Sequence, residues 1–434
     1  MTKLCSLPVL RAILLVLCAL PMLLLPQRAD AADAGLPGQV VAKLFSAADR
    51  ASVQSRYRLQ LLRQLGPRPI YLFRTPVGVD PNVVVTALRG DARVDFAERN
   101  FVVQEPEARK RAVWAIGRAS VYQTQWAPAR LRLGEAQQFA TGHGVTVAVL
   151  DTGADYTHPA LASRLLPGVD FVDGDLDASE TGTRLDAGFG HGTHVAGLVA
   201  LFAPEARIWP LRVLDARGRG NIWSVSEALL HAANPDGLAA TGDHAHVINL
   251  SLGTTAPTEL LDKVVELVTC SDDDEDEDND DYSDPGFAVD RERCNLHHGS
   301  VVVAAAGNGG SATELQFPAA ERAEGALAVA ASNVYERLAT FSNRGPWISI
   351  AAPGAGITST VPGGGYGVWN GTSMAAPIVA GIAALVRQAN PDWKPVDITR
   401  RLLDRAAPLC GSVIPRVDAH GAVFDQVPAS PACP

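Results

Sequence analysis

The chain has 434 residues, 47% of them hydrophobic, and a formal net charge of −10. Its length allows more than one domain, and its charge is divided unevenly: residues 35–111 contain 13 Lys or Arg and 7 Asp or Glu, whereas residues 112–434 contain 21 and 38. An acidic main body without a basic stripe argues against nucleic-acid binding. The basic first part is suited to pairing with the acidic second part.

Residues 1–34 have the pattern of a cleavable secretory signal. Lys3 precedes an apolar run from Ala12 to Leu25, and two small-residue sites follow it, Ala29-Asp30-Ala31 and Ala32-Asp33-Ala34. The apolar run is shorter than the roughly 20 residues that a spanning helix needs. We therefore expect a secreted protein, extracellular or periplasmic, without a stable membrane anchor.

Residues 38–105 are predicted to form a small α+β unit. Their patterning indicates, in chain order, a strand, a long helix, a strand, a short helix and two short closing strands, at residues 40–45, 47–65, 70–73, 82–88, 94–96 and 101–103. With one strand left unassigned, this order suggests the β-α-β-β-α-β ferredoxin-like fold. The charged residues 106–111 then read as a linker.

Beyond the linker the pattern changes to buried strands that alternate with helices. Residues 145–150, 247–251 and 301–305 are nearly continuous β-rich runs. This alternation predicts an α/β fold with a doubly wound, mostly parallel sheet and helices on both faces. Functional groups in such sheets gather at the carboxyl ends of strands, where Asp151 and Asn308 are placed.

Three segments supply a carboxylate, an imidazole and a hydroxyl: Asp151-Thr152-Gly153, 191–197 with His191 and His194, and 371–377 with Ser373. Each has an ordinary explanation by itself, as a turn, a pair of metal ligands or a helix cap. The histidine pair lacks the glutamate of zinc peptidase helices. Together the segments provide what nucleophilic catalysis by a serine requires.

Residues 147–153, 190–197, 304–308 and 370–377 resemble the four signature blocks of the subtilisin-like serine proteases, the subtilases, and the resemblance extends over about residues 122–425. It implies the following roles: Asp151 as the orienting acid, His191 as the general base, His194 as a structural residue, Ser373 as the nucleophile and Asn308 as an oxyanion donor. The chemistry would need no cofactor. The alternative is a secreted pseudoprotease that binds peptides without cutting them.

The same resemblance implies how substrates bind and how the chain matures. Ser251-Leu252-Gly253 and Ala305-Ala306-Gly307 would form the two walls along an extended peptide, which predicts broad specificity with an apolar preference. Residues 35–111 would be a propeptide that assists folding and occupies the site, 112–425 the peptidase domain and 426–434 a tail. We expect autocatalytic cleavage between Glu105 and Tyr122.

Four cysteines remain after removal of the signal, and we favour the pairs Cys270 with Cys294 and Cys410 with Cys433, because each closes a short segment. The set also allows two other pairings, or free buried thiols. The first pair encloses an acidic insertion, 270–294, in which residues 272–281 comprise nine acidic residues and one Asn. A solvated loop is the first interpretation, and a weak calcium site or attraction of basic substrates are alternatives.

A second candidate for structural calcium comes from the spacing of Asp170, Asp173, Asp175 and Asp177. This spacing is similar to the metal loop of thermitase-like subtilases, and alternating carboxylates can surround a hard cation. A solvated loop is the alternative.

Overall fold

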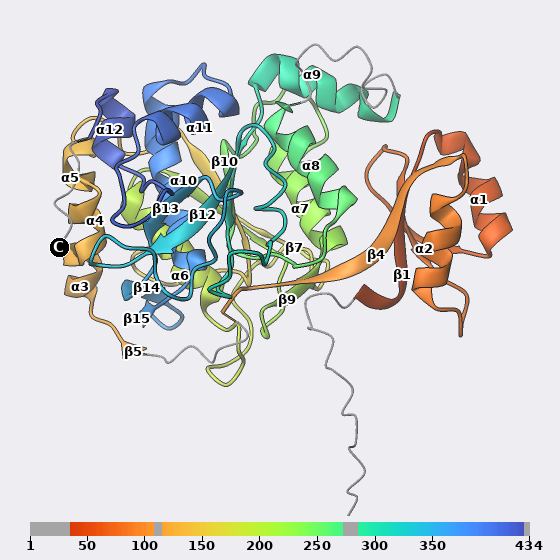
Figure 1. Cartoon of the computed structure of the whole chain (residues 1–434), viewed down its shortest axis with the longest axis horizontal. Coiled ribbons are helices and arrows are strands. Elements are labelled where there is room, and N and C mark those ends of the chain that lie inside the picture. Colours follow the sequence, from red (N-terminus) through yellow and green to blue (C-terminus); the bar gives the residue numbers. More distant parts are fainter. Residues whose placement is uncertain (1–34, 108–114, 272–284, 429–434) are drawn as a thin grey trace, which may run out of the picture.

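The computed structural model describes residues 35–107, 115–271 and 285–428 (Figure 1). The predicted signal, most of the acidic insertion and Cys433 lie outside these residues. The described chain forms a small N-terminal unit, residues 35–104, and a larger α/β unit. A single long strand, β4 (Val94–Gln104), runs from the first into the second.

The N-terminal unit has the pairing of a ferredoxin-like fold. Its other elements are β1 (Gly35–Leu44), η2 (Ala47–Asp49), α1 (Arg50–Tyr57), β2 (Gln60–Gln64), β3 (Ile70–Arg74) and α2 (Pro81–Arg89). The strands are antiparallel in the order β2-β3-β1-β4. Both helices pack on the sheet through one buried apolar cluster.

Two predicted elements of this unit are wrong in extent. The helix expected over 47–65 ends at Tyr57, because Arg58 takes the left-handed conformation with φ of 53°, and β2 follows. The apolar spacing of residues 59–65 is compatible with a helix or a strand. Pairing of β2 with β3 favours the strand. The two closing strands, 94–96 and 101–103, form one strand, since β4 pairs with β1 along most of its length.

The larger unit contains a parallel seven-stranded sheet in the order β13-β12-β11-β10-β6-β8-β7. The strands are β6 (Thr146–Asp151), β7 (Val169–Asp170), β8 (Arg207–Arg212), β10 (Val247–Leu250), β11 (Val301–Ala305), β12 (Ala326–Ser332) and β13 (Ile350–Pro353). A smaller sheet contains β5 (Ala115–Ile116), β14 (Ile357–Val361) and β15 (Gly365–Trp369).

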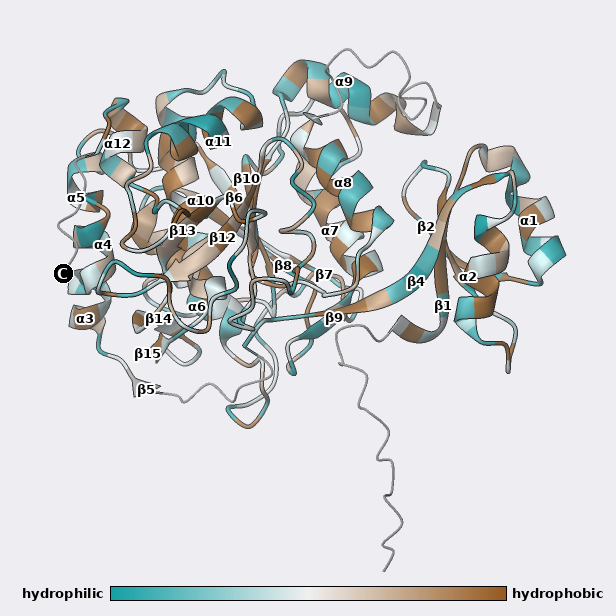
Figure 2. Cartoon of the chain, viewed as in Figure 1, coloured by the Kyte–Doolittle hydropathy of each residue, from teal (hydrophilic) through white to brown (hydrophobic). Residues whose placement is uncertain are grey.

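Helices cover both faces of the parallel sheet, which confirms the predicted doubly wound fold. Alternate residues of β6 point to opposite faces: Val147 and Val149 join the cluster of α6 (His191–Phe202) and α10 (Thr372–Ala389). Ala148 and Leu150 join the cluster of α7 (Ile222–Ala233) and α8 (Glu259–Thr269). The apolar residues concentrate in the sheet and the helix faces that meet it (Figure 2).

The remaining helices lie around this core. They are α3 (Ala119–Thr124), α4 (Trp126–Arg130), α5 (Leu133–Ala136), η5 (Pro285–Phe287), α9 (Ala288–His297), α11 (Pro395–Asp404) and α12 (Ala419–Phe424). Among the described residues only α10 is long and apolar enough to cross a membrane, but 89% of it is buried in the protein. It is therefore the central core helix of this fold.

Candidate active site

Asp151 and His191 form a buried pair at the carboxyl edge of the parallel sheet. Asp151 is the last residue of β6, and His191 is the first residue of α6. Asp151 Oδ1 lies 2.7 Å from His191 Nδ1. The two segments approach closely because Gly192 has no side chain: a Cβ there would overlap with the carbonyl oxygen of Gly153.

Several carboxylates surround the His191 ring. Burial alone would lower its pKa, but the nearby carboxylates, first among them that of Asp151, outweigh burial and raise that pKa well above its ordinary value. His194 differs, since burial lowers its pKa to about 3 and its ring stacks on Trp369 at 4.7 Å between centroids. The two histidines therefore lie in different electrostatic environments, as their predicted roles require.

Ser373 is the second residue of α10, which begins at Thr372 and contains Pro377. Pro377 has no N–H to donate to the carbonyl oxygen of Ser373. The Ser251 hydroxyl donates to that oxygen instead, at 2.9 Å. Ser251, predicted as a substrate-binding residue, thus contacts the backbone of the nucleophile.

Asn308 is held with its amide nitrogen directed at the same site. Its Oδ1 accepts from the Thr372 backbone N–H at 2.9 Å and from the Thr372 hydroxyl at 3.0 Å. These bonds fix the side-chain orientation and leave Nδ2 as a donor. That orientation suits the predicted oxyanion role.

The carboxylate of Glu107 occupies the centre of this group. Its Oε2 accepts from Ser373 Oγ at 2.6 Å and lies 3.2 Å from His191 Nε2, and its Oε1 accepts from Asn308 Nδ2 at 2.7 Å. Gly371 leaves room for this carboxylate, because a Cβ there would overlap with Oε1 in its present position. Sequence reasoning placed Glu107 in a linker and missed this position.

Residues 102–105 lie between two segments of the larger unit. Gln104 exchanges both backbone hydrogen bonds with Gly253, at 2.9 and 3.0 Å. On the other side, residues 102–104 pair with the antiparallel strand β9 (Arg219–Asn221), and the Glu105 N–H donates to the Gly218 carbonyl at 3.1 Å. Gly253 thus pairs with an extended segment, and its contact with substrate stays a prediction.

The second wall along this segment is β9, which the sequence analysis did not identify. The signal available was the turn-rich Arg217-Gly218-Arg219-Gly220-Asn221 run before a helix. Within the described chain, residues 305–307 form no hydrogen bond with residues 102–107; the Gly307 N–H donates to the Thr372 hydroxyl at 3.0 Å. A contact of Ala305-Ala306-Gly307 with substrate, and one of Leu252, stay predictions.

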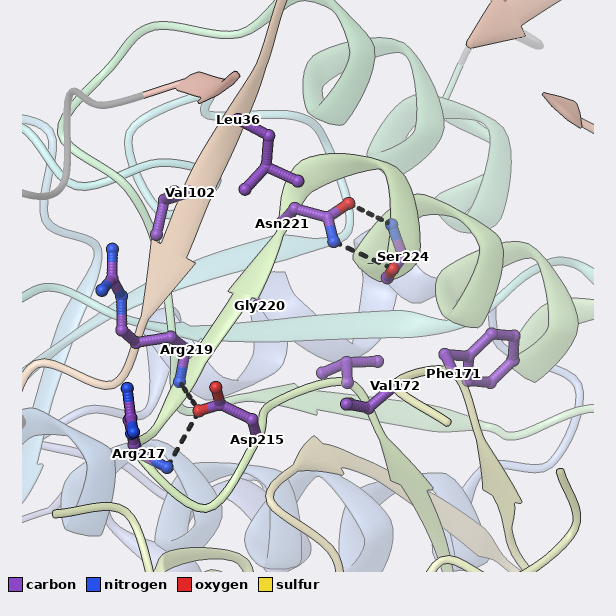
Figure 3. Close-up of a pocket in the computed structure, with 11 residues that line it drawn as sticks. Leu36, Val102, Phe171, Val172, Asp215, Arg217, Arg219, Gly220, Asn221 and Ser224 are labelled. Atoms are coloured by element: carbon purple, nitrogen blue, oxygen red, sulfur yellow. Dashed lines mark hydrogen bonds between the residues drawn. The ribbon is translucent and has the colours of Figure 1, made fainter. Parts of the chain in front are cut away.

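The loop that carries β9 is fixed by its own polar residues (Figure 3). Asp215 Oδ1 accepts from the backbone N–H groups of Arg217 and Arg219, at 2.9 and 3.0 Å. Asn221 caps α7 by accepting from the Ser224 N–H at 3.1 Å. A cavity of about 350 Å³ lies beside this loop, and Val102 of the N-terminal unit forms part of its lining.

Glu105 is fully buried beside the imidazole, with its Oε2 3.5 Å from His191 Nδ1. Burial raises the pKa of Glu105 to about 8; His191 opposes this, and the Glu107 and Asp151 carboxylates add to it. The Glu105 side chain therefore favours its protonated form in this position.

Glu180 joins the two segments that carry the acid and the base, and it too was missed. Its Oε1 accepts from the Thr152 hydroxyl at 2.6 Å, and its Oε2 accepts from the Thr193 hydroxyl and N–H at 2.8 and 3.1 Å. Thr152 follows Asp151 directly, and Thr193 is two residues after His191. Burial raises the pKa of Glu180 to about 7.

The predicted calcium ligands do not assemble into a metal site. The carboxylates of Asp170 and Asp173 both accept from Arg212 Nη1, so a guanidinium supplies the positive charge. Asp175 and Asp177 accept from the backbone N–H groups two residues further on, at 2.9 and 3.1 Å. Among the described residues no group of three or more His, Cys, Asp or Glu could hold a metal ion. The described residues therefore give no support to the calcium prediction for this loop, which stays a prediction.

The predicted disulfide between Cys270 and Cys294 is present. Cys410 is also disulfide-bonded. Its predicted partner, Cys433, lies outside the described residues, as do the acidic residues 272–281.

Comparison with known proteins agrees with this geometry. The model of the subtilase family matches residues 142–425. The thermophilic serine proteinase of Bacillus sp. strain AK1 is 36% identical over 314 residues, which cover 70% of this chain and 65% of that protein. Subtilisin BL of Lederbergia lenta is 38% identical over 278 residues, which cover 62% of this chain and 86% of that protein. The chain thus spans a little less than two thirds of the first relative.

Solved structures show the same fold. Fervidolysin from Fervidobacterium pennivorans, a keratinolytic enzyme related to subtilisin, matches with a TM-score of 0.67 at 21% identity over 91% of this chain and 62% of its own. A protease from Pseudoalteromonas arctica matches with a TM-score of 0.56 at 30% identity. The match covers 70% of this chain and 98% of that protease. The family match over most of the chain, with the identities above, shows that this protein belongs to the subtilase family of serine proteases.

Proposed function

We propose that the protein is a secreted serine endopeptidase that is made as a latent precursor, blocked by its own residues 35–107. The observation that carries this proposal is the position of residues 102–107, which we term the blocking segment. It pairs with β9 and Gly253 and delivers the Glu107 carboxylate to Ser373 Oγ at 2.6 Å. A substrate peptide cannot reach Ser373 while the segment is there.

In the proposed mechanism, departure of the blocking segment frees the Ser373 hydroxyl to pair with His191 Nε2. His191 removes the proton as Oγ attacks a peptide carbonyl, and Asp151 stabilises the imidazolium that forms. Asn308 Nδ2 and the Ser373 N–H bind the oxyanion. His191 then protonates the leaving amine, and water hydrolyses the acyl-enzyme. These steps use only side chains, backbone and water.

Substrates would bind in the extended form that the blocking segment takes. Backbone pairing with β9 and Gly253 does not depend on the substrate sequence, which favours broad specificity. Val102 and Val103 of the segment are buried there, in line with the predicted apolar preference. A peptide library with its strongest cleavage after basic residues would contradict that preference.

The test is labelling of Ser373 with a fluorophosphonate, together with mass measurement and N-terminal sequencing of the secreted product. The processed chain should react, and Ser373→Ala should neither react nor process itself. We expect the new N-terminus between Glu105 and Tyr122. An intact, unreactive wild-type chain would favour the peptide-binding pseudoprotease instead.

A further inference from the structure

A second contact between the N-terminal unit and the larger unit lies away from the catalytic residues, at α9. Arg68, in the turn between β2 and β3, donates from Nε and Nη2 to the two carboxylate oxygens of Asp290, at 2.9 and 2.5 Å. The two side chains are only 9% and 2% exposed. Removal of either partner of such a buried, bidentate pair should destabilise the interface, because it leaves the other charge buried and uncompensated.

Apolar and aromatic contacts extend the same interface. Phe287, just before α9, is 1% exposed and belongs to one buried cluster with Leu65 and Ile70 of the N-terminal unit. Lys43 Nζ lies 5.8 Å from the centroid of the Phe287 ring. The segment from Phe287 to Asp290 thus offers both an apolar and an anionic group to the N-terminal unit.

α9 is itself held against α8. The Cys270–Cys294 disulfide joins the C-terminal end of α8 to α9, and Arg293 Nη2 donates to the Leu267 carbonyl at 2.6 Å. The other end of α8 is capped by Glu98 of β4, which accepts from the Leu260 N–H at 3.1 Å. The N-terminal unit therefore contacts both ends of the α8–α9 pair.

We propose that α9 is a docking element for residues 35–107, in which the Arg68–Asp290 pair sets how tightly the N-terminal unit is held and the disulfide keeps α9 in place to receive it. The partner is a β-sheet unit that presents an arginine from the turn at its edge. This inference rests on the proposed latent precursor, because it assigns the strength of that inhibition to the helix between Ala288 and His297.

The test is hydrogen exchange at constant pH on the full-length Ser373→Ala chain, which does not depend on activity. Asp290→Asn should increase exchange of the Val102–Gln104 amides at least about 100-fold, as expected for loss of one partner of a buried pair. Glu292→Gln, an exposed carboxylate on the same helix, should have no effect. Protection of α10 reports separately on the peptidase fold.

Exchange of the two charges distinguishes loss of the ion pair from general destabilisation of the protein by a substitution. Asp290→Arg should increase hydrogen exchange of the β4 amides. The double variant Arg68→Asp with Asp290→Arg should restore most of their protection from exchange. The double variant Cys270→Ser with Cys294→Ser should also raise β4 exchange. Unchanged β4 exchange in Asp290→Asn, equal loss of protection in β4 and α10, or no recovery in the charge exchange would overturn the proposal.

The active chain separates this inference from the proposed function. With Ser373 present, Asp290→Asn should shorten the lag before peptidase activity appears. A chain that never becomes active would refute the proposed function, while the exchange result would still decide whether α9 is a docking element.

Discussion

Glu105 should make binding of the N-terminal part depend on pH, and Glu105→Gln should remove that dependence between about pH 7 and about pH 8. The Glu105 side chain is 1% exposed, and its burial raises its pKa to about 8. His191 lowers that pKa, whereas the carboxylates of Glu107, Asp151 and Glu180 raise it. The docked segment therefore keeps a proton that Glu105 loses in water.

The sign and size of the effect follow from this difference. An ordinary glutamate has a pKa of 4.5, about 3.5 pH units below that of docked Glu105. Docking is thus fully favourable below about pH 4.5 and weakens as the pH rises through about 8. At about 1.4 kcal/mol per pH unit, the largest change is about 5 kcal/mol. Glu105 alone should raise the dissociation constant by up to about tenfold per pH unit in this range.

The assay uses a Ser373→Ala chain with a specific protease site introduced at residues 109–111. After the cut, the affinity of the two parts is measured by fluorescence titration from about pH 5 to about pH 9. Glu98 provides the matched control, because burial raises its pKa to about 7 at the cap of α8. Glu98→Gln should reduce the slope only below about pH 7, whereas Glu105→Gln should reduce the slope below about pH 7 and remove it between about pH 7 and about pH 8.

Two results would refute this reasoning. The first is an affinity that is equal at about pH 5 and about pH 9 with Glu105 present. The second is a Glu105→Gln profile with the original slope between about pH 7 and about pH 8, where the proton on Glu105 is the one expected to be lost. A Glu105→Gln chain that binds more weakly but has a flat profile between about pH 7 and about pH 8 agrees with the prediction.

Three further predictions concern the catalytic groups. Asn308→Ala in the processed enzyme should lower kcat about 100- to 1,000-fold with little change in KM; steady-state kinetics that show an unchanged kcat would contradict the oxyanion role. Glu107→Ala should speed fluorophosphonate labelling of the uncleaved chain at least about tenfold, because Ser373 loses a charge-assisted bond; equal rates would mean that the carboxylate does not shield Ser373. Glu180→Gln should lower kcat about 3- to 10-fold, the effect of one weakened hydrogen bond. Asp186→Asn, in the same loop, is its control, and an equal loss there would rule out a specific role for Glu180.

The catalytic groups could be predicted because each stands in a distinctive local setting. Asp151 ends a β-rich run, His191 begins an apolar helix, and Ser373 is the second residue of another. The chain order and the surrounding blocks then linked them. The helix start at Thr372 was less certain, because Pro377 reads as a first-turn proline, whereas Ser251 satisfies the carbonyl that Pro377 leaves without its usual donor.

The groups that were missed depend on residues distant in the sequence. Glu107 contacts His191, Asn308 and Ser373, which are 84, 201 and 266 residues away. Nothing in its charged neighbourhood distinguishes it from a linker glutamate. Such a contact becomes visible only when β4 is placed along β9.

The calcium prediction for residues 170–177 has no support in the described structure, for a related reason. The spacing of the loop aspartates describes oxygens along one segment, but Arg212, which pairs with Asp170 and Asp173, comes from β8. A local pattern of carboxylates does not reveal a cation carried by another strand. Their spacing therefore could not separate a metal loop from a salt-bridged one.

Activation requires little rearrangement of the peptidase unit. The Asp151–His191 pair is formed at 2.7 Å, and Asn308 is already oriented by Thr372. What the proposed precursor lacks is a free Ser373 hydroxyl, because that group donates to Glu107. Under this proposal, displacement of a few residues at the end of β4 would complete the site, and the barrier to activity would reside in the contacts that hold the N-terminal unit in place. Those contacts include charged groups at Glu105, Glu98 and the Arg68–Asp290 pair, so pH and charge substitutions should change latency more than they change the catalytic geometry.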